Sequence, residues 1–431
     1  MARPSDRVHR ARVRRKRLAL GAAMAAMSTV LVACSSSSGP PVLNWYINPD
    51  TGGQDAIAKN CSTNDYTIQT QVLPSDASQQ RIQLARRLAA NDDSIDLMSI
   101  DPPYTAEFSN AGYLAPIPAD LASKLEQQSF KGATTAATWN GKLVVAPFWS
   151  NTQVLWYRKS FVEKAGIDMS KPVTWDQIIK AAADNGGTVA VQANKYEGYS
   201  VWINALVSGA GGNIVEDANK GVDATITIDS PAGEDAAKVI EELSGSKAAP
   251  ADISVSNEGT AGSTFGSDKG AFMVNWTYIW HNYDETAPDV AKDIGYAKYP
   301  ETIEGKPSRP PYGGIGLGVS KFSKHVDEAM QAVECLTSAK SQGINAEMTG
   351  NMPASPAGYD YAPLKKIYPP DLLALFQESV DAAAPRSVTP YWSDISSALL
   401  STWHSPTSVN DNTPKNSATF IESVLKGDAL L

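Results

Sequence analysis

The side chains that stand out chemically in this 431-residue sequence are aromatic, amide and carboxylate groups. The chain contains 10 Trp, 16 Tyr and 9 Phe. Aromatic rings stack on the C–H faces of sugars, and carboxylates, amides and guanidinium groups hydrogen-bond vicinal hydroxyls. Because large aromatic side chains usually serve a core, only those at special positions are candidates for binding.

Two positions at the ends of expected strands meet that condition. Trp276 follows Phe272–Asn275, which reads as a strand, so its ring would emerge at the carboxyl end of that strand. Asp101 ends the apolar stretch Ile95–Ile100, where an ionised carboxylate needs partners or water. A sugar diol could supply partners to Asp101, and a cap for the following helix at Pro102 accounts for it equally well.

Catalytic and cofactor motifs are lacking in the sequence. Apart from His9, the histidines are His281, His325 and His404, and they form neither an HExxH pair nor another spacing typical of metal ligands. No G-x-S-x-G elbow occurs. The glycine-rich stretch 313–318 lacks the Lys-Ser/Thr of a phosphate loop and favours a closely packed strand. We therefore predict no metal and no cofactor.

The elements that position these residues follow a regular order at the start of the chain. Buried strands alternate with helices, which predicts a parallel sheet. Ligands bind beyond the carboxyl ends of such strands, where Asp50 and Asp101 would lie. The expected strands and helices are Val42–Ile47, a helix from about 53 through Cys61, Thr67–Leu73, a helix around Arg81–Leu88, and Ile95–Ile100.

The N-terminus has the composition of an export signal. Eight basic residues lie within 3–17, and an apolar stretch of 16 residues follows at 18–33. Leu31-Val32-Ala33-Cys34, followed by Ser35–Pro40, resembles a bacterial lipobox, which predicts a signal peptide at 1–33, a lipid on Cys34 and a flexible tether at 34–41. The alternative is an ordinary secretory peptide with an incidental cysteine. Sec and Tat export both remain open.

Charge and length limit the classes of protein that fit. Removal of residues 1–33 moves the formal charge from -9 to -16, which argues against a nucleic-acid partner. The remaining 398 residues predict two domains. No later segment is long enough to span a membrane, so the lipid would be the sole anchor, on the outer face of the cell membrane.

Two cysteines, Cys61 and Cys335, remain after Cys34. An exported chain meets an oxidising compartment, so we predict that they form a disulfide. Two separate buried thiols are the alternative, because spacing alone does not establish proximity.

Three successive motifs carry a resemblance to a known family. They are "LWYRK" at 155–159, "F.EKAGID" at 161–168 and "P.TW..II.AA" at 172–182. They resemble the sugar-binding proteins of bacterial ABC importers (solute-binding protein family 1), from about Leu43 to the C-terminus. Further blocks resemble the mycobacterial trehalose-binding lipoproteins: 83–88, 105–108, 151–153, 191–194, 275–276 and 389–390. The stretch from about 280 to 313 is shorter here, and the residues around Asp50 differ.

The resemblance implies an α/β fold of the two-lobed periplasmic-binding-protein type II, with a cleft between the lobes. Lobe one would comprise 41–150 plus 315–350, and lobe two 155–310 plus 353–431. The chain would cross between them at hinges near 150–154, 311–315 and 350–353. Cys61 and Cys335 would then share a lobe, which favours their pairing. Within the helix that begins after Thr174, Gln177 completes an expected capping box.

The resemblance also implies a set of binding residues. Trp276 would be the stacking platform and Arg386 a bidentate sugar clamp, while Tyr278 and Trp280 are expected to be structural. Outside this resemblance, Asn151 would be a turn amide, Glu258 a partner of a helix dipole and Arg386 a solvated charge. The expected ligand-binding residues are Asp50, Gln80, Asp101, Asn151, Glu197, Glu258, Asn275, Trp276, Gly314 and Arg386.

The function implied is capture without catalysis. The protein would be a monomer that binds a disaccharide, trehalose before others, by closure of the lobes and delivers it to the transmembrane subunits of an ABC permease. Three alternatives stay open: a binding protein for another oligosaccharide such as maltose, an extracytoplasmic glycoside hydrolase using Asp101 and Glu258, and a lipoprotein scaffold that binds only protein.

Overall fold

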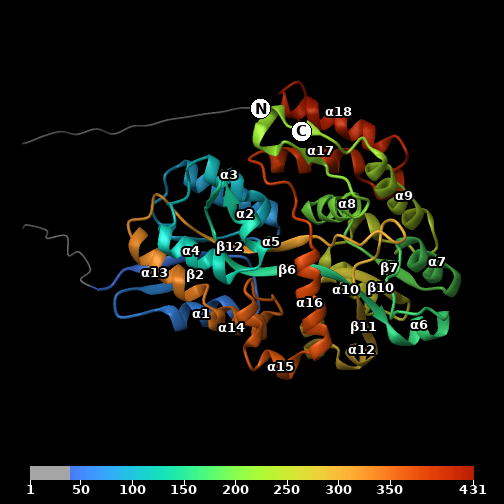
Figure 1. Ribbon diagram of the computed structural model, residues 1–431, viewed down its shortest axis with the longest axis horizontal. Coiled ribbons are helices and arrows are strands. Elements are labelled where there is room, and N and C mark those ends of the chain that lie inside the picture. Colours follow the sequence, from blue (N-terminus) through green and yellow to red (C-terminus); the bar gives the residue numbers. More distant parts are fainter. Residues whose placement is uncertain (1–38) are drawn as a thin grey trace, which may run out of the picture. The chain divides into compact units, whose positions relative to one another are not determined.

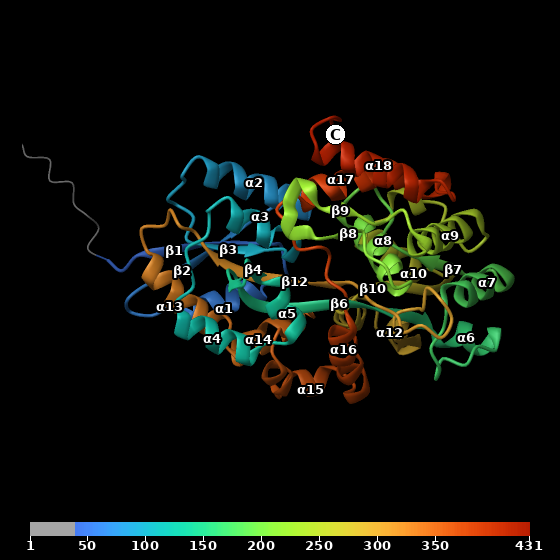
Figure 2. The same ribbon diagram turned by 45° about the horizontal axis from the view of Figure 1, so that its top comes forward.

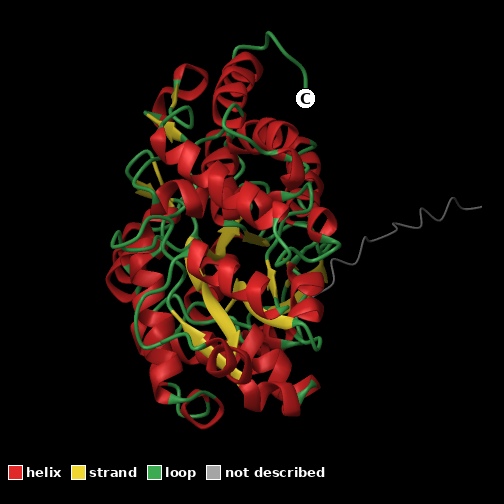
Figure 3. Ribbon diagram, turned by 90° about the vertical axis from the view of Figure 1, so that its right-hand side faces the viewer, coloured by secondary structure: helices red, strands yellow, loops and turns green. Residues whose placement is uncertain are grey.

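The computed structural model describes residues 39–431. The expected signal peptide, the lipidation site at Cys34 and most of the tether lie outside these residues. In the described part, strands form an interior sheet and helices cover it (Figure 3). No helix of residues 39–431 is both long enough and apolar enough to cross a membrane.

An eight-stranded sheet runs through the described chain in the order β2-β1-β3-β12-β6-β10-β7, with β11 pairing a second stretch of β6. β1 is parallel to β2 and β3, as the strand–helix alternation predicts, whereas β12 is antiparallel to β3 and β6. The strands are β1 Val42–Ile47, β2 Thr67–Val72, β3 Leu97–Ile100, β6 Ala146–Arg158, β7 Thr188–Ala190, β10 Gly270–Trp276, β11 Ile294–Ala297 and β12 Tyr312–Val319.

The long strand β6 connects two halves of this sheet. Residues 146–152 of β6 pair with β12, whereas residues 153–158 pair with β10 and β11. Residues 146–156 of β6 are all buried, as expected of a strand that is covered on both faces. One continuous strand therefore carries the chain from the first lobe into the second.

The first lobe places helices on both faces of β1–β3. Figure 2 shows α2 and α3 on one side of these strands and α1, α13 and α14 on the other. The disulfide of Cys61 with Cys335 joins the end of α1 to α13. The helices are α1 Gly53–Cys61, α2 Ala77–Ala89, α3 Thr105–Asn110, α4 Ala119–Gln128, α5 Lys131–Ala136, α13 Val326–Leu336 and α14 Ala339–Thr349.

The second lobe surrounds β7, β10 and β11 (Figure 1). Trp175, Trp202, Trp392 and Trp403 are fully buried in its core. The capping box expected at Thr174 is confirmed, with both reciprocal bonds to Gln177. The remaining helices of residues 39–431 are α6 Lys159–Ala165, α7 Trp175–Asn185, α8 Glu197–Gly209, α9 Pro231–Gly245, α10 Glu258–Phe265, α11 Ile279–Thr286, α12 Pro288–Asp293, α15 Leu364–Ile367, α16 Pro370–Ala382, α17 Trp392–Trp403 and α18 Thr413–Leu425, of which α15 contacts α14.

Smaller elements complete the chain. Two hairpins pair β4 Thr138–Trp139 with β5 Lys142–Leu143, and β8 Val215–Glu216 with β9 Thr225–Ile226. The short 3₁₀ segments of residues 39–431 are η1 Pro102–Tyr104, η2 Ala218–Asp223, η3 Ile253–Val255, η4 Pro356–Asp360 and η5 Pro406–Ser408.

Three segments lie side by side near the middle of β6. The Ser150 N–H donates to the carbonyl of Met352 at 2.9 Å, and the Thr152 hydroxyl donates to the carbonyl of Pro311 at 2.9 Å. Asn151 Nδ2 donates to Asn351 Oδ1 at 2.9 Å. These bonds join the segments expected to be hinges. The lobe boundaries and the hinge motion themselves stay predictions.

Candidate functional site

A cavity of about 430 Å³ opens between the two lobes. Its walls come from the ends of β1, β3 and β10, the first turns of α2, α8 and α10, and the middle of β6 and β12. This volume falls within the roughly 300–1,000 Å³ typical of small-molecule sites. The cavity is therefore the candidate ligand site.

Nine of the ten expected ligand-binding residues line this cavity. From the first lobe and the crossings come Asp50, Gln80, Asp101, Asn151 and Gly314, and from the second lobe come Glu197, Glu258, Trp276 and Arg386. Sequence reasoning therefore selected residues that the fold brings together, although their roles toward a ligand stay predictions.

Asn275 is the exception, and its expected place in the site is corrected. Its side chain is fully buried beneath the cavity wall, and it does not line the cavity. Nδ2 donates to the carbonyl of Glu258 at 3.1 Å, and Oδ1 accepts from the N–H of Trp276 at 2.9 Å. In a strand, alternate side chains point to opposite faces, so Asn275 points away from the cavity when Trp276 points into it. The Asn275 side chain instead binds the backbone of Trp276 and Glu258, which both line the cavity.

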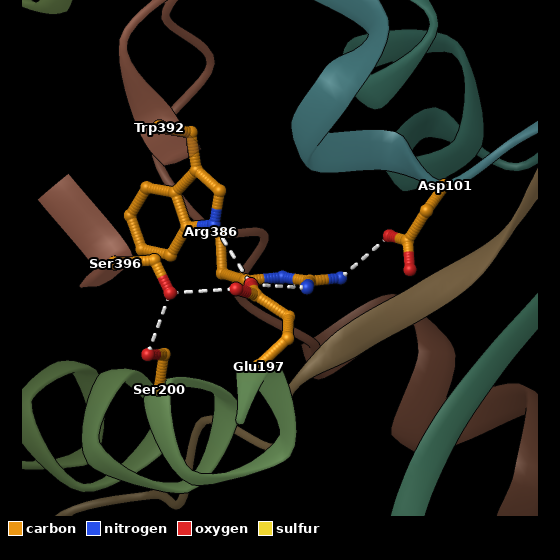
Figure 4. A network of polar contacts seen from close by, with 6 residues as sticks. All are labelled: Asp101, Glu197, Ser200, Arg386, Trp392 and Ser396. Carbon is orange, nitrogen blue, oxygen red and sulfur yellow. Dashed lines mark hydrogen bonds and ion pairs between the residues drawn. The ribbon is translucent and has the colours of Figure 1, made fainter. Parts of the chain in front are cut away.

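Arg386 forms the centre of a buried polar network at one end of the cavity (Figure 4). Its guanidinium donates to Glu197 Oε1 at 2.7 Å and to Asp101 Oδ1 at 3.0 Å. Asp101 follows β3 in the first lobe, whereas Glu197 opens α8 in the second. The arginine therefore links the two walls of the cleft. The alternative to a ligand-binding role, a solvated charge, is wrong because only 6 % of Arg386 is exposed.

Glu197 is held from three directions. Besides Arg386, it accepts from Trp392 Nε1 at 2.7 Å and from the Ser396 hydroxyl at 2.6 Å, and Ser396 also contacts Ser200 at 2.8 Å. α17 thus supplies two donors to a carboxylate on α8. A buried carboxylate needs such donors because an unpaired buried charge is costly.

Burial shifts the ionisation of two other carboxyl groups. It raises the pKa of Asp101 to about 6, which Arg386 partly opposes and Glu197 reinforces. Burial also raises the pKa of Glu258, an effect that the Tyr196 and Trp276 side chains partly oppose. Loss of hydration disfavours the charged form in both cases.

The cavity also has an aromatic wall, to which Trp276 and Tyr278 contribute. Trp276 ends β10 as expected, and a Cβ at Gly313 would lie 2.7 Å from Cζ3 of its ring. Gly314 has a φ of 133° and passes so close to β6 that a Cβ would lie 2.2 Å from the carbonyl oxygen of Trp149. Both glycines therefore serve close approach at the cavity.

Several lining residues were missed by the sequence analysis. Tyr278, expected to be structural, lines the cavity two residues after Trp276, whereas Trp280 packs on Tyr296 away from it. Asn48 and Asp76 follow β1 and β2, so the rule that parallel strands end at one edge could have found them. The other missed polar or aromatic residues are Thr51, Ser75, Trp149, Tyr196, Thr349 and Asn351.

Asp50 lies at the cavity but serves α1. Its Oδ1 accepts from the N–H of Gly52 and its Oδ2 from the N–H of Gln54, both at 2.9 Å. These bonds satisfy donors at the start of the helix. In residues 39–431, no group of three or more His, Cys, Asp or Glu residues is arranged to hold a metal ion.

The fold and the cleft define a class of protein. Residues 50–343 match the family model of bacterial extracellular solute-binding proteins, and the chain belongs to this family. It is therefore a solute-binding protein and not an enzyme, and the glycoside hydrolase alternative falls.

Two relatives show how this likeness extends over the chain. A "Probable ABC transporter-binding protein" of Deinococcus radiodurans is 26% identical over 353 residues, which are 78% of this chain and 80% of the relative. The "Diacetylchitobiose binding protein DasA" of Streptomyces coelicolor is 25% identical over 337 residues, 77% of this chain and 72% of the relative.

Solved structures establish the two-lobed α/β fold. Maltose-bound MalE3 of T. maritima superposes with a TM-score of 0.78 and 22% identity, covering 90% of this chain and 100% of that one. The GacH receptor of Streptomyces glaucescens, described unliganded and with acarbose, gives 0.76 and 22% identity, covering 90% and 99%. The expected fold class is confirmed.

Proposed function

We propose that this protein is the extracytoplasmic substrate-binding subunit of an ABC sugar importer. The observation that carries this is the cavity between the lobes, which combines the Trp276 ring with carboxylate, amide and hydroxyl groups on the facing walls. Stacking and planar polar partners are the two contacts that sugars need. The named relatives that bind maltose, acarbose and diacetylchitobiose support the same class of ligand.

We further propose a disaccharide as the ligand, with trehalose as the first candidate and maltose as the second. The volume of about 430 Å³ supports a compact oligosaccharide rather than a polymer. The preference for trehalose rests on the sequence blocks that resemble the mycobacterial trehalose-binding lipoprotein LpqY. In this proposal Trp276 stacks on one ring, and Asp101, Glu258 and Arg386 hydrogen-bond hydroxyls.

The delivery step completes the proposal. The lobes close by bending near 150–154, 311–315 and 350–353, which is supported by the polar bonds that hold these segments together. A lipid on Cys34 would keep the monomeric receptor beside its permease and raise the local concentration of captured sugar.

Calorimetry of residues 35–431 with trehalose, maltose, sucrose and maltotriose tests the ligand class. We expect saturable heat with at least one disaccharide and the tightest binding with trehalose. Tighter binding of maltose would replace trehalose as the ligand, and tighter binding of maltotriose would replace the disaccharide. Absence of heat and of thermal stabilisation with the whole panel would overturn the sugar-binding proposal.

An assay for hydrolysis of the bound sugar distinguishes a binding protein from an enzyme. Each sugar that binds is incubated with a stoichiometric amount of protein for a day and then quantified by chromatography. Complete recovery of the intact sugar is expected of a binding protein, whereas release of glucose would contradict it.

A further inference from the structure

The turn after β1 forms the longest continuous part of the cavity wall. Residues 48–51 all line the cavity, whereas no other segment of residues 39–431 contributes more than three consecutive residues. They lie between the end of β1 at Ile47 and the start of α1 at Gly53. Backbone groups in such a turn lack the regular bonds of a strand or helix, so its conformation depends on other partners.

Gln54, in the first turn of α1, holds this turn from the interior of the first lobe. Its side chain is fully buried and does not line the cavity. Nε2 donates to the carbonyl of Asn48 at 2.9 Å and to Asp50 Oδ2 at 3.1 Å. One amide group therefore joins two residues of the wall to the helix that follows them.

The same amide is bonded to the sheet. Gln54 Oε1 accepts from the Ser99 hydroxyl at 3.1 Å, and Ser99 Oγ accepts from Trp45 Nε1 at 3.2 Å. Ser99 lies on β3 and Trp45 on β1, and both side chains are buried. The turn at the cavity is thus connected through Gln54 to two strands of the first lobe.

The chemistry of these groups permits one orientation of the Gln54 amide. An indole N–H can only donate, so the single hydroxyl proton of Ser99 is left for Gln54 Oε1. A backbone carbonyl and a carboxylate can only accept, so the amide NH₂ group must face Asn48 and Asp50. A reversed amide would set its oxygen against two other oxygens, with no proton between them.

Asn48 has capacity left for a ligand. Its Oδ1 is buried and has no hydrogen-bond partner in residues 39–431, while Nδ2 makes only a long contact of 3.5 Å with the carbonyl of Pro49. A buried polar atom without a partner is unfavourable, and a hydroxyl donor on a ligand would remove that cost. The residue that Gln54 holds is therefore one that a sugar can satisfy.

Stability alone does not call for this polar chain, because hydrogen-bonded partners can often be replaced by apolar groups of the same shape at little cost. The chain adds a defined direction. We propose that Gln54 is a positioning residue, which fixes Asn48 and Asp50 in the cavity wall and thereby sets the affinity for the ligand. This inference rests on the proposed sugar-binding function and adds how the site is held in its binding geometry.

Gln54→Met tests the proposal, because methionine keeps the shape and removes all three bonds of the amide. The sugar that binds most tightly among trehalose, maltose, sucrose and maltotriose is titrated calorimetrically, well below the melting temperature of each protein. We expect binding to weaken at least about tenfold. An affinity equal to that of the unmodified protein would overturn the proposal.

Gln342→Met is the matched control. Gln342 is a buried amide of α14 that does not line the cavity, and it also makes three bonds, to the Thr337 carbonyl and to the N–H and hydroxyl of Ser355. We expect its affinity to change less than about twofold. An equal loss of affinity in both variants would reduce Gln54 to an ordinary buried amide and overturn its positioning role.

Ser99→Ala is a milder variant that serves if Gln54→Met does not fold. It removes only the donor to Gln54 Oε1, so the amide loses its fixed direction while Nε2 keeps its acceptors. We expect binding to weaken about threefold. An unchanged affinity in this variant would contradict the proposal.

Hydrogen exchange keeps the inference testable if no sugar binds and the proposed function fails. The N–H groups of Gly52 and of residue 54 both donate to the Asp50 carboxylate. They should exchange at least about tenfold faster in Gln54→Met, and about threefold faster in Ser99→Ala, than in the unmodified protein and in Gln342→Met. Equal rates at these two positions, or a uniform increase across the lobe, would overturn the positioning role.

Discussion

The two ends of the cavity handle buried charge in opposite ways. At one end, Arg386 pairs with Glu197 and Asp101, and Trp392 and Ser396 complete the partners of Glu197. At the other end, Trp276, Glu258 and Asp76 present polar and aromatic groups without an ion pair. The difference teaches that the fold itself neutralises the charges around Arg386, whereas Glu258 and Asp76 border the cavity without a cationic partner in residues 39–431.

The largest effect should come from breaking the paired end. Arg386→Ala leaves Glu197 with a buried charge and should cost about 3–5 kcal/mol in the free energy of unfolding, measured by denaturant titration. Arg81→Ala is the control, because its pair with Glu107 is more exposed and should contribute about 1 kcal/mol or less. Equal losses in both variants would remove the distinction between a buried network and an ordinary ion pair.

Removing the Trp276 ring from the aromatic wall should weaken sugar binding without unfolding the protein. Trp276→Ala should weaken binding of the best disaccharide by about thirtyfold, or about 2 kcal/mol, while the melting temperature changes little because the ring lies at the surface of the cavity. Trp280→Ala, outside the cavity, serves as the control. A variant at 276 that binds as tightly as the unmodified protein would rule out stacking there.

Asp101 should make the stability of the paired end depend on pH. Its pKa of about 6 in the folded state exceeds the ordinary value of 3.8, so between those values the folded state binds more protons than the unfolded state. The contribution of Asp101 to stability therefore falls as pH rises from about 4 to about 6, by about 2–3 kcal/mol in total.

Asp101→Asn removes this titration and checks it. The free energy of unfolding of the variant, relative to that of the unmodified protein, should rise by that amount between pH 4.5 and pH 7. Measurement of the difference between the two proteins cancels the carboxyls that titrate independently of Asp101. A difference that stays flat over this range would show that Asp101 titrates normally.

The smallest effect is expected at Gly313, whose backbone lies close to the ring of Trp276. A methyl group at Gly313 would lie 2.7 Å from the ring, so Gly313→Ala should tilt Trp276 and weaken binding about tenfold, or about 1.4 kcal/mol. Gly262→Ala is the matched control, since its added methyl group meets nothing closer than 3.9 Å. Similar affinities of the two variants would mean that the ring position does not matter.

Much of the fold could be predicted because its signals are local. The apolar stretches of β1 and β3, the spacing of the first helices and the capping box at Thr174 depend on neighbouring residues, and each is confirmed. Asp101 and Trp276 could also be predicted as cavity residues, because each lies at the carboxyl end of an apolar strand. The family resemblance then supplied residues such as Glu197 and Arg386, which have no local signature of their own.

The roles of individual side chains were harder to predict. Asn275 and Trp276 are adjacent, yet only Trp276 faces the cavity, because the position of a strand within the sheet decides which face meets the cleft. Asp50 and Asp76 are both acidic residues near helix starts, yet the bonds at α1 occupy both oxygens of Asp50 and those at α2 only one of Asp76.

By itself, the sequence determined the order of the first strands and helices, the family and nine of the residues that line the cavity, since periodicity and motifs are properties of short segments. Only the tertiary structure decided which charges are paired. Asp101, Glu197 and Arg386 are separated by up to 285 positions along the chain, and they meet only because β6 carries the polypeptide from one lobe to the other. Electrostatic pairing depends on distance in space, so it becomes defined when the lobes have folded and come together.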